Sequence, residues 1–260
     1  MTTQTDKAEL LRSLHVPGTP LILANVWDAV TARIVAGAPG VRAIASASHA
    51  VSYSHGVADG EGLTLDQALA AARLIVDAVD LPVTIDFERA YAPDAPGVEA
   101  NVRRLIETGA VGLNLEDSNS DTSLFSLEDA ASRVAAARAA GDRSGVPIVI
   151  NARVDALIRG AEWPEMITRA NAYLAAGADV VFMLGLSTED TVKRALAEID
   201  GRVSVMAGAA SVPLRRLAEL GVSRVSFGPG ILGLALSHVR DAAETLTALD
   251  DYPSELAFPY

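Results

Sequence analysis

Val83-Thr84-Ile85-Asp86-Phe87-Glu88-Arg89 sets a pattern that the chain repeats twice, an apolar run that ends in charged side chains. The other two copies are Val111-Gly112-Leu113-Asn114-Leu115-Glu116-Asp117 and Val149-Ile150-Asn151-Ala152-Arg153-Val154-Asp155. Runs of this kind are typical of strands buried on both faces of a parallel sheet. The carboxyl ends of parallel strands meet at one edge, so we expect these charged side chains to lie together at the rim where barrel enzymes work.

Apolar runs of this type alternate eight times with amphipathic helical segments, which predicts consecutive parallel βαβ units. Gly109, Gly177 and Gly221 each stand at a predicted helix end just before the next strand, where a positive φ is needed. No G-x-G-x-x-G motif opens a helix, so the sequence favours an α/β fold of the (β/α)8 TIM barrel type over an open doubly wound sheet. The strands are predicted near residues 21–25, 43–46, 82–85, 111–115, 147–151, 180–183, 203–206 and 224–227.

We expect residues 1–260 to form one barrel domain, because α/β barrels of about 250 residues are commonly single units. A helix over residues 5–15, within a leading segment of residues 1–18, is expected to plug the bottom of the barrel. Residues 240–260 are expected to form a C-terminal helix and a tail. The aromatic residues of this tail would dock on the same barrel or on a neighbour's.

Composition excludes several classes of protein. The net charge of −12 argues against a nucleic-acid surface. No apolar segment is long enough to span a membrane and the first residues lack a signal-peptide pattern, so a cytoplasmic location is expected. The chain has no cysteine, which excludes thiol chemistry, and neither Lys7 nor Lys193 follows a predicted strand, which leaves no evident Schiff-base amine. The chemistry must use carboxylates, arginine, hydroxyls, histidine or a metal.

Four acids follow the third and fourth predicted strands: Asp86, Glu88, Glu116 and Asp117. Carboxylates crowded at one site repel each other unless a cation holds them or some take up protons. Hard oxygen ligands suit Mg²⁺, with Mn²⁺ as the alternative, and Mg²⁺ keeps positions open for substrate oxygens. The sequence therefore predicts a divalent metal site at the rim.

The order of these motifs resembles the isocitrate lyase/phosphoenolpyruvate mutase superfamily over roughly residues 20 to 235. The matching pieces are N-x-W-D-A from Asn25, a Ser-rich turn before the G-V-x-D at Gly56, the acid-x-acid pair from Asp86, G-x-x-L-E-D from Gly112 and N-A-R-x-D-A from Asn151. Short phosphoenolpyruvate mutase-like members look most similar.

The resemblance implies a Mg²⁺-dependent lyase or decarboxylase that works on a small 2-oxo or 2-hydroxy acid through a metal-stabilised enolate. It also implies a homo-oligomer, a dimer or tetramer, in which the last helices pack on a neighbouring barrel. By this resemblance Asp86, Glu88 and Glu116 would hold the metal, directly or through water, and Arg153 would bind the substrate. We list as further substrate-binding candidates Trp27, Ser46, Ala47, Ser48, Arg89 and Asn119, and as catalytic candidates Arg153, His49 and Asp59.

Two departures from the family pattern bear on the substrate. The loop of residues 118–125 lacks the cysteine of isocitrate-type lyases, which disfavours isocitrate cleavage, and it lacks the lysine of phosphonate enzymes, which makes phosphonopyruvate chemistry the runner-up. Arg89-Ala90-Tyr91-Ala92 stands where many relatives have Gly-Tyr-Gly after the acid pair, which removes freedom for positive φ. Arg89 could weaken metal binding, but we favour the hypothesis that it binds a second substrate carboxylate.

Other interpretations of the same residues remain open. Asp28, Asp117 and Asp155 could cap helices, Arg153 could form an ion pair with Asp155 or Glu116, and His49 could be a surface residue. The loop of residues 226–230 could cradle a phosphate, which would make the protein a phosphate-binding aldolase or synthase. A barrel that has lost catalysis and serves as a scaffold is the non-enzyme alternative.

Overall fold

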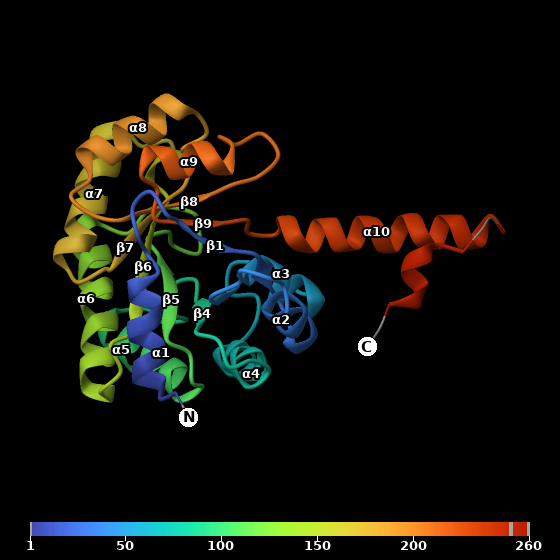
Figure 1. The fold of residues 1–260 in the computed structure, drawn as a ribbon. Helices are drawn as coiled ribbons and strands as arrows, with labels where there is room; N and C mark the ends of the chain where they lie inside the picture. The colour runs from blue at the N-terminus through green and yellow to red at the C-terminus, as the bar shows by residue number, and fades with distance from the viewer. Residues whose placement is uncertain (1, 250–251, 259–260) are drawn as a thin grey trace.

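A sheet of nine parallel strands forms the centre of the computed structural model, which describes residues 2–249 and 252–258 (Figure 1). Its order is β1-β9-β8-β7-β6-β5-β4-β3-β2, and every neighbouring pair is parallel. The strands are β1 (Leu21–Leu23), β2 (Asn25–Val26), β3 (Ile44–Ser46), β4 (Val83–Asp86), β5 (Gly112–Glu116), β6 (Val149–Val154), β7 (Val180–Met183), β8 (Val203–Met206) and β9 (Arg224–Ser226).

The sheet closes on itself, apart from a break at Ala24. β1 and β2 are two halves of one strand, since only Ala24 separates them. β1 pairs with β9 through Leu21 and Arg224, and β2 pairs with β3 through Asn25 and Ala45. The predicted (β/α)8 barrel is confirmed. The largest difference is at β6, which runs three residues beyond the predicted end because its pairing with β5 and β7 continues.

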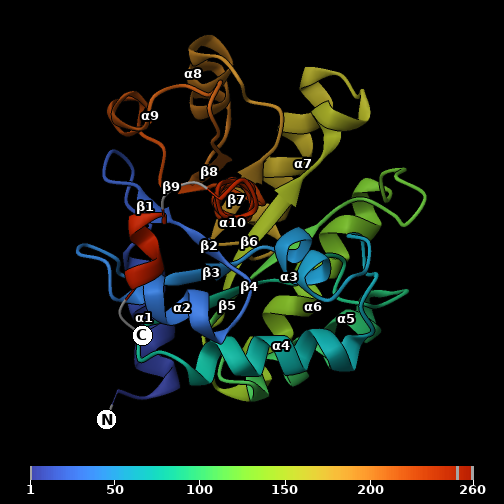
Figure 2. The same ribbon diagram turned by 90° about the vertical axis from the view of Figure 1, so that its right-hand side faces the viewer.

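Helices surround the barrel, as Figure 2 shows. The predicted left-handed helix ends are confirmed at Gly109, Gly177 and Gly221, with φ values of 92°, 108° and 104°. One short helix, α3, lies where we expected only a loop. The helices are α1 (Gln4–Ser13), α2 (Ala29–Ala36), α3 (Ser48–Ser54), α4 (Leu65–Asp77), α5 (Ala95–Glu107), α6 (Leu127–Ser144), α7 (Trp163–Ala175), α8 (Glu189–Glu198), α9 (Leu214–Leu220) and α10 (Gly230–Thr247), with 3-10 turns at Ala156–Arg159 and Ser254–Ala257.

The first helix packs on the first residues of a central strand of the barrel. Thr3 caps α1, whose Leu11 is fully buried against Gly112 at the start of β5. A side chain at Gly112 would come within 2.7 Å of Leu11 Cδ2, so glycine is needed for this close approach. The opposite mouth of the barrel, where the strands end, is left open for a site.

The last long helix departs from the prediction. α10 begins at Gly230, ten residues before the expected start, and extends away from the barrel (Figure 1). Leu232 is its one buried residue among those described. Tyr252 in the tail does not dock on the same barrel, since it is 83% exposed, and Tyr260 lies outside the described residues. No helix in residues 2–249 and 252–258 is both long enough and apolar enough to cross a membrane.

Candidate active site

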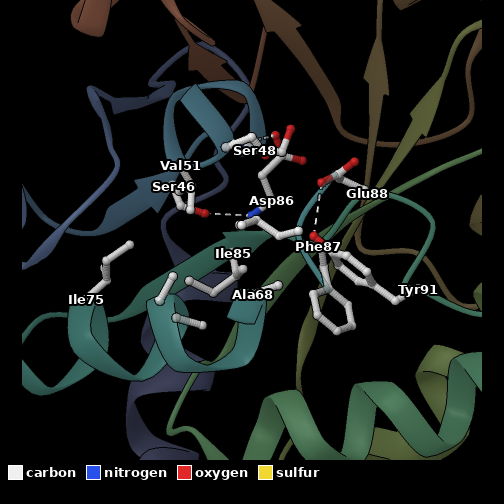
Figure 3. Close-up of a pocket in the computed structure, with 14 residues that line it drawn as sticks. Ser46, Ser48, Val51, Ala68, Ile75, Ile85, Asp86, Phe87, Glu88 and Tyr91 are labelled. Carbon is white, nitrogen blue, oxygen red and sulfur yellow. Dashed lines mark hydrogen bonds between the residues drawn. The ribbon is translucent and has the colours of Figure 1, made fainter. Parts of the chain in front are cut away.

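A pocket with about 440 Å³ of empty space lies at the C-terminal mouth of the barrel. Its walls come from the ends of several strands and from the segment after β3, as expected for barrel enzymes. The lining residues are Asn25, Ala47, Ser48, His49, Asp59, Asp86, Asn114, Arg153, Phe182, Leu184, Met206, Ser226, Gly228 and Pro229. We call this cavity the mouth pocket. A second cavity lies between β4 and α4 and shares Ser48 and Asp86 with it (Figure 3).

Asp86 ends β4 and is held in place from three sides. Its backbone N–H donates to Ser46 Oγ (2.8 Å), which Figure 3 shows. Its carboxylate accepts the Ser48 backbone N–H (2.9 Å) and Asn114 Nδ2–H (3.2 Å). No arginine or lysine within the described ranges forms an ion pair with Asp86. Each carboxylate oxygen therefore keeps acceptor capacity facing the mouth pocket.

Glu88 is engaged by the loop that follows β3. Its two carboxylate oxygens accept the Tyr91 hydroxyl (3.0 Å) and the Glu61 backbone N–H. Burial raises the pKa of Glu88 to about 7, and the charges of Asp86 and Asp59 act in the same direction. Near neutral pH this carboxyl is therefore divided between its protonated and ionised forms.

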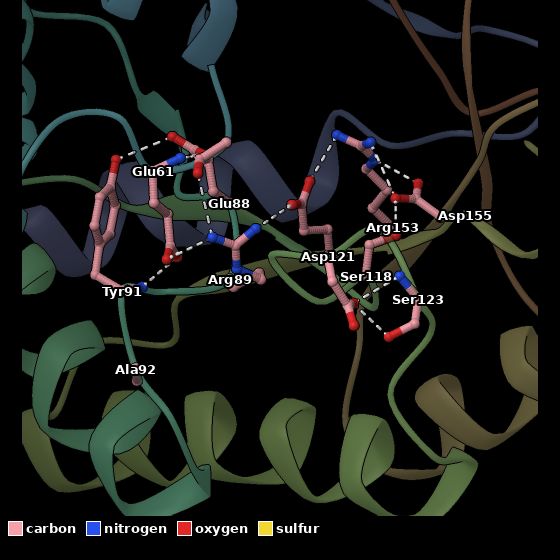
Figure 4. Close-up of polar contacts among 12 residues, drawn as sticks. Glu61, Glu88, Arg89, Tyr91, Ala92, Ser118, Asp121, Ser123, Arg153 and Asp155 are labelled. Carbon is pink, nitrogen blue, oxygen red and sulfur yellow. Dashed lines mark hydrogen bonds and ion pairs between the residues drawn. The ribbon is translucent and has the colours of Figure 1, made fainter. Parts of the chain in front are cut away.

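Charges of alternating sign cross the rim in the order Glu61, Arg89, Glu116, Arg153 and Asp155. Figure 4 shows four of them, Glu61, Arg89, Arg153 and Asp155. The closest N–O distances are 2.8 Å, 3.9 Å, 2.8 Å and 2.6 Å in that order. We call this set the charge chain. Burial raises the pKa of Glu116, while the nearby positive charge of Arg153 opposes that rise.

Arg153 keeps donors for a substrate although it is already paired. Two of its five guanidinium N–H groups donate to Asp155, and Nη1 forms an ion pair with Glu116 Oε2 at 2.8 Å. The side chain is 20% exposed and lines the mouth pocket. N–H groups of Nη1 and Nη2 that donate to no protein acceptor among the described residues can bind a carboxylate in the pocket.

Asp28, Asp117 and Asp155 were each predicted either to cap a helix or to act in the site, and the structure gives them different roles. Asp28 caps α2, since its side chain accepts the Thr31 N–H. Asp117 accepts the Asp155 N–H (2.8 Å) and the Tyr173 hydroxyl (2.7 Å), so it ties β5 to β6 and α7. Asp155 makes no capping bond and binds Arg153.

The predicted site residues fall into two groups. Ala47, Ser48, His49, Asp59, Asp86 and Arg153 meet in the mouth pocket. His49 Nδ1 lies 3.7 Å from Asp59 Oδ2, and its ring stacks on Tyr53.

The other predicted residues lie outside that pocket. Trp27 packs against the apolar residues Ala47 and Leu232, and Asn119 binds Ser123 within its own loop. Glu88, Arg89 and Glu116 stand beside the pocket, and Ser46 supports Asp86 from below. Within residues 2–249 and 252–258, no three acids or histidines form a ready metal cage.

A layer of polar residues lies inside the barrel, and the sequence did not predict it. Asn114 and Asn151 lie two positions before Glu116 and Arg153, so period-two alternation alone places them on the same face of their strands. Arg224 at the start of β9 joins them, because its Nη2 donates to Asn114 Oδ1 (3.1 Å). No local pattern pointed to this arginine.

The loop after β4 keeps a left-handed backbone without glycine. Glu88, Ala90 and Tyr91 have φ values of 50°, 62° and 54°. We expected alanine to remove this conformation, and for Ala90 the expectation was wrong. Asn101 Nδ2 donates to the carbonyls of Ala90 and Tyr91, which offsets a cost of roughly 1–2 kcal/mol per left-handed residue.

Comparison with known proteins agrees with this geometry. The phosphoenolpyruvate phosphomutase family model matches residues 11–247. An oxaloacetate decarboxylase of Pseudomonas entomophila (strain L48) is 30% identical over 227 residues, which is 84% of this chain and 76% of that protein.

Two solved structures extend the comparison. A "putative phosphonomutase" from Burkholderia cenocepacia J2315 is 38% identical with a TM-score of 0.88, over 93% of this chain and 99% of that one. The 2,3-dimethylmalate lyase, described as a PEP mutase/isocitrate lyase superfamily member, is 25% identical with a TM-score of 0.85, over 95% and 86% of the two chains. The protein therefore belongs to the phosphoenolpyruvate phosphomutase family of the isocitrate lyase/phosphoenolpyruvate mutase superfamily, a group of enzymes that includes carbon–carbon lyases.

Proposed function

We propose that the protein is a Mg²⁺-dependent carbon–carbon lyase or decarboxylase of a small 2-oxo or 2-hydroxy carboxylic acid. The observation that carries the proposal is that two side chains line one pocket: Asp86, whose carboxylate forms no ion pair among the described residues, and Arg153, whose guanidinium keeps free N–H donors. Relatives named as an oxaloacetate decarboxylase and a dimethylmalate lyase support the same class of reaction.

The donor set fits a hard divalent cation. Asp86 offers carboxylate oxygens to the mouth pocket, and Mg²⁺ typically takes one or two protein carboxylates and fills its other positions with water and substrate oxygens. Glu88 and Glu116 are engaged by Glu61 and Arg153, so we assign them to water-mediated contacts. When bound, the cation would polarise the keto group and stabilise negative charge that develops on its oxygen.

Side chains of this protein would bind the substrate and transfer the proton. Arg153 would hold the substrate carboxylate and so fix the bond that breaks relative to the keto group. Loss of CO₂ from a 2-oxo acid leaves an enolate, which needs a proton at carbon. Cleavage of a 2-hydroxy acid first passes the hydroxyl proton to a base as the aldehyde or keto fragment leaves, and the enolate that remains needs a proton at carbon in the same way. The His49 side chain reaches the same pocket with Asp59 beside its Nδ1, so we assign proton delivery to His49 and orientation of the ring to Asp59.

Thermal melting with defined additives tests the proposal. We expect Mg²⁺ with oxalate, a planar dianion that resembles the enolate of pyruvate, to raise the melting temperature, and Asp86→Asn to lose that rise. A parallel screen of 2-oxo and 2-hydroxy acids, including oxaloacetate and phosphonopyruvate, should detect release of pyruvate or glyoxylate. A rise in melting temperature with inorganic phosphate alone would favour a phosphate-binding aldolase or synthase. Release of phosphate from phosphonopyruvate would favour the phosphonopyruvate enzyme. No response in either experiment would favour the non-catalytic scaffold.

Histidine substitution tests proton delivery. His49→Gln is expected to lower kcat about 100-fold with a smaller change in KM, because a positioned acid or base contributes roughly 10²–10⁴-fold. His55→Gln is the matched control, since His55 follows the same helix but binds the Val51 carbonyl outside the mouth pocket. Wild-type turnover in His49→Gln would remove His49 from the mechanism.

Arg89 is proposed to bind the second carboxylate of a dicarboxylic substrate by exchanging its bond to Glu61. Arg89→Met should raise KM for a dicarboxylic 2-oxo acid about tenfold or more and affect a monocarboxylic one much less. Arg103→Met, on the exposed face of α5, is the control. An unchanged KM for the dicarboxylic acid would count against this role.

We also propose a homo-oligomer in which α10 packs on a neighbouring barrel. Leu234, Leu236 and Val239 are 59%, 42% and 66% exposed on this helix, and large apolar side chains exposed to water favour association. Light scattering after gel filtration should give a dimer or larger species. Val239→Glu should weaken assembly, whereas Arg240→Glu, one position further along, should do so less. A wild-type monomer at micromolar concentration would contradict the proposal.

A further inference from the structure

A positive charge lies buried inside the barrel beneath the mouth pocket. Arg224 begins β9 and is 1% exposed. Its Nη2 reaches Asn114 on β5, a strand four places away in the nine-strand order, so the guanidinium crosses the interior of the barrel. Within the described parts of the chain it has no carboxylate partner, and its Nε and Nη1 have no hydrogen-bond partner. Burial of an unpaired charge is costly, so a compensating interaction is required.

The compensating charge is Asp86. Burial lowers the pKa of Arg224 to about 10, and the negative charge of Asp86 opposes that drop. Arg224 therefore remains protonated at neutral pH. The other two arginines of the site have their own carboxylates, since Arg89 pairs with Glu61 and Arg153 with Glu116.

Asn114 connects the two charges. Its Oδ1 accepts one hydrogen bond from Arg224 Nη2 (3.1 Å) and a second from Asn151 Nδ2 (2.8 Å). Because two N–H donors meet this end of the Asn114 amide, this end must be the oxygen. The opposite end, Nδ2, must then point at Asp86 Oδ1, 3.2 Å away.

We propose that Arg224 is a positioning residue, which fixes the Asn114 amide from inside the barrel and thereby holds the Asp86 carboxylate toward the mouth pocket. Arg224 touches neither the pocket nor a reacting atom. Its expected effect on metal binding rests on the proposed function, whereas its effect on the position of Asp86 does not.

Crystal structures of metal-free wild type and Arg224→Met provide the first test. Without the guanidinium, the Asn114 amide and the Asp86 carboxylate are expected to rotate or to occupy more than one conformation. Arg224→Lys is the second variant in case methionine prevents folding, and we expect an intermediate result because an ammonium lacks the forked donors of a guanidinium. An unmoved Asn114 and Asp86 in every variant that folds would overturn the proposal.

Mn²⁺ affinity, measured by titration calorimetry or electron paramagnetic resonance, provides the second test. Loss of a residue that orients a metal ligand typically costs 10–100-fold in affinity, and we expect Arg224→Met to fall in that range. Arg138→Met is the matched control, because that partly buried arginine binds Gly177 and Asp179 on the outside of the barrel.

A double variant separates positioning from general loss of structure. If Arg224 acts through Asn114, adding Arg224→Met to Asn114→Leu should weaken Mn²⁺ binding no further than Asn114→Leu alone. Additive losses, or equal losses in the Arg138→Met control, would overturn the proposal. If wild type binds no Mn²⁺, the proposed metal dependence fails and the crystal structures still decide the role of Arg224.

Discussion

The ion pair between Glu116 and Arg153 follows directly from strand register. These residues are opposite each other in the β5–β6 pair, so the register that buries Leu113 and Ile150 also brings this carboxylate and guanidinium within 2.8 Å. A slip of one residue in either strand would turn the side chains of that strand to the other face of the sheet and so separate the two charges. Breaking a buried pair of this kind costs about 3–5 kcal/mol, so core packing and site geometry are coupled.

The charge chain extends that coupling across the rim. Glu116 faces an arginine on each side, and the outer arginines end on Glu61 and Asp155. Such alternation lets several charges lie close together with an excess of one negative charge, since three carboxylates face two guanidinium groups. Asp86 stands apart from it, free of ion pairs among the described residues, and is therefore the carboxylate best prepared for an external cation.

The loop after β4 holds a left-handed backbone without glycine. Ala90 adopts a left-handed conformation that glycine would accept without strain. Bonds from Asn101 to the loop and from Tyr91 N–H to Glu61 (2.8 Å) hold it there. Arg89, which enters the charge chain from this loop, is then placed between Glu61 and Glu116 rather than in the open pocket.

The sequence by itself determined the barrel, most of its strands and the gathering of Asp86, Glu116 and Arg153 at one rim, because period-two burial and strand direction are local properties. Only the tertiary structure decided which of these acids are already bound by other protein groups and which can bind a ligand. The engagement of Glu88 by Glu61 and the reach of Arg224 to Asn114 join residues 27 and 110 positions apart. Contacts over such distances depend on barrel closure and on loop conformation, which no local pattern of residues encodes.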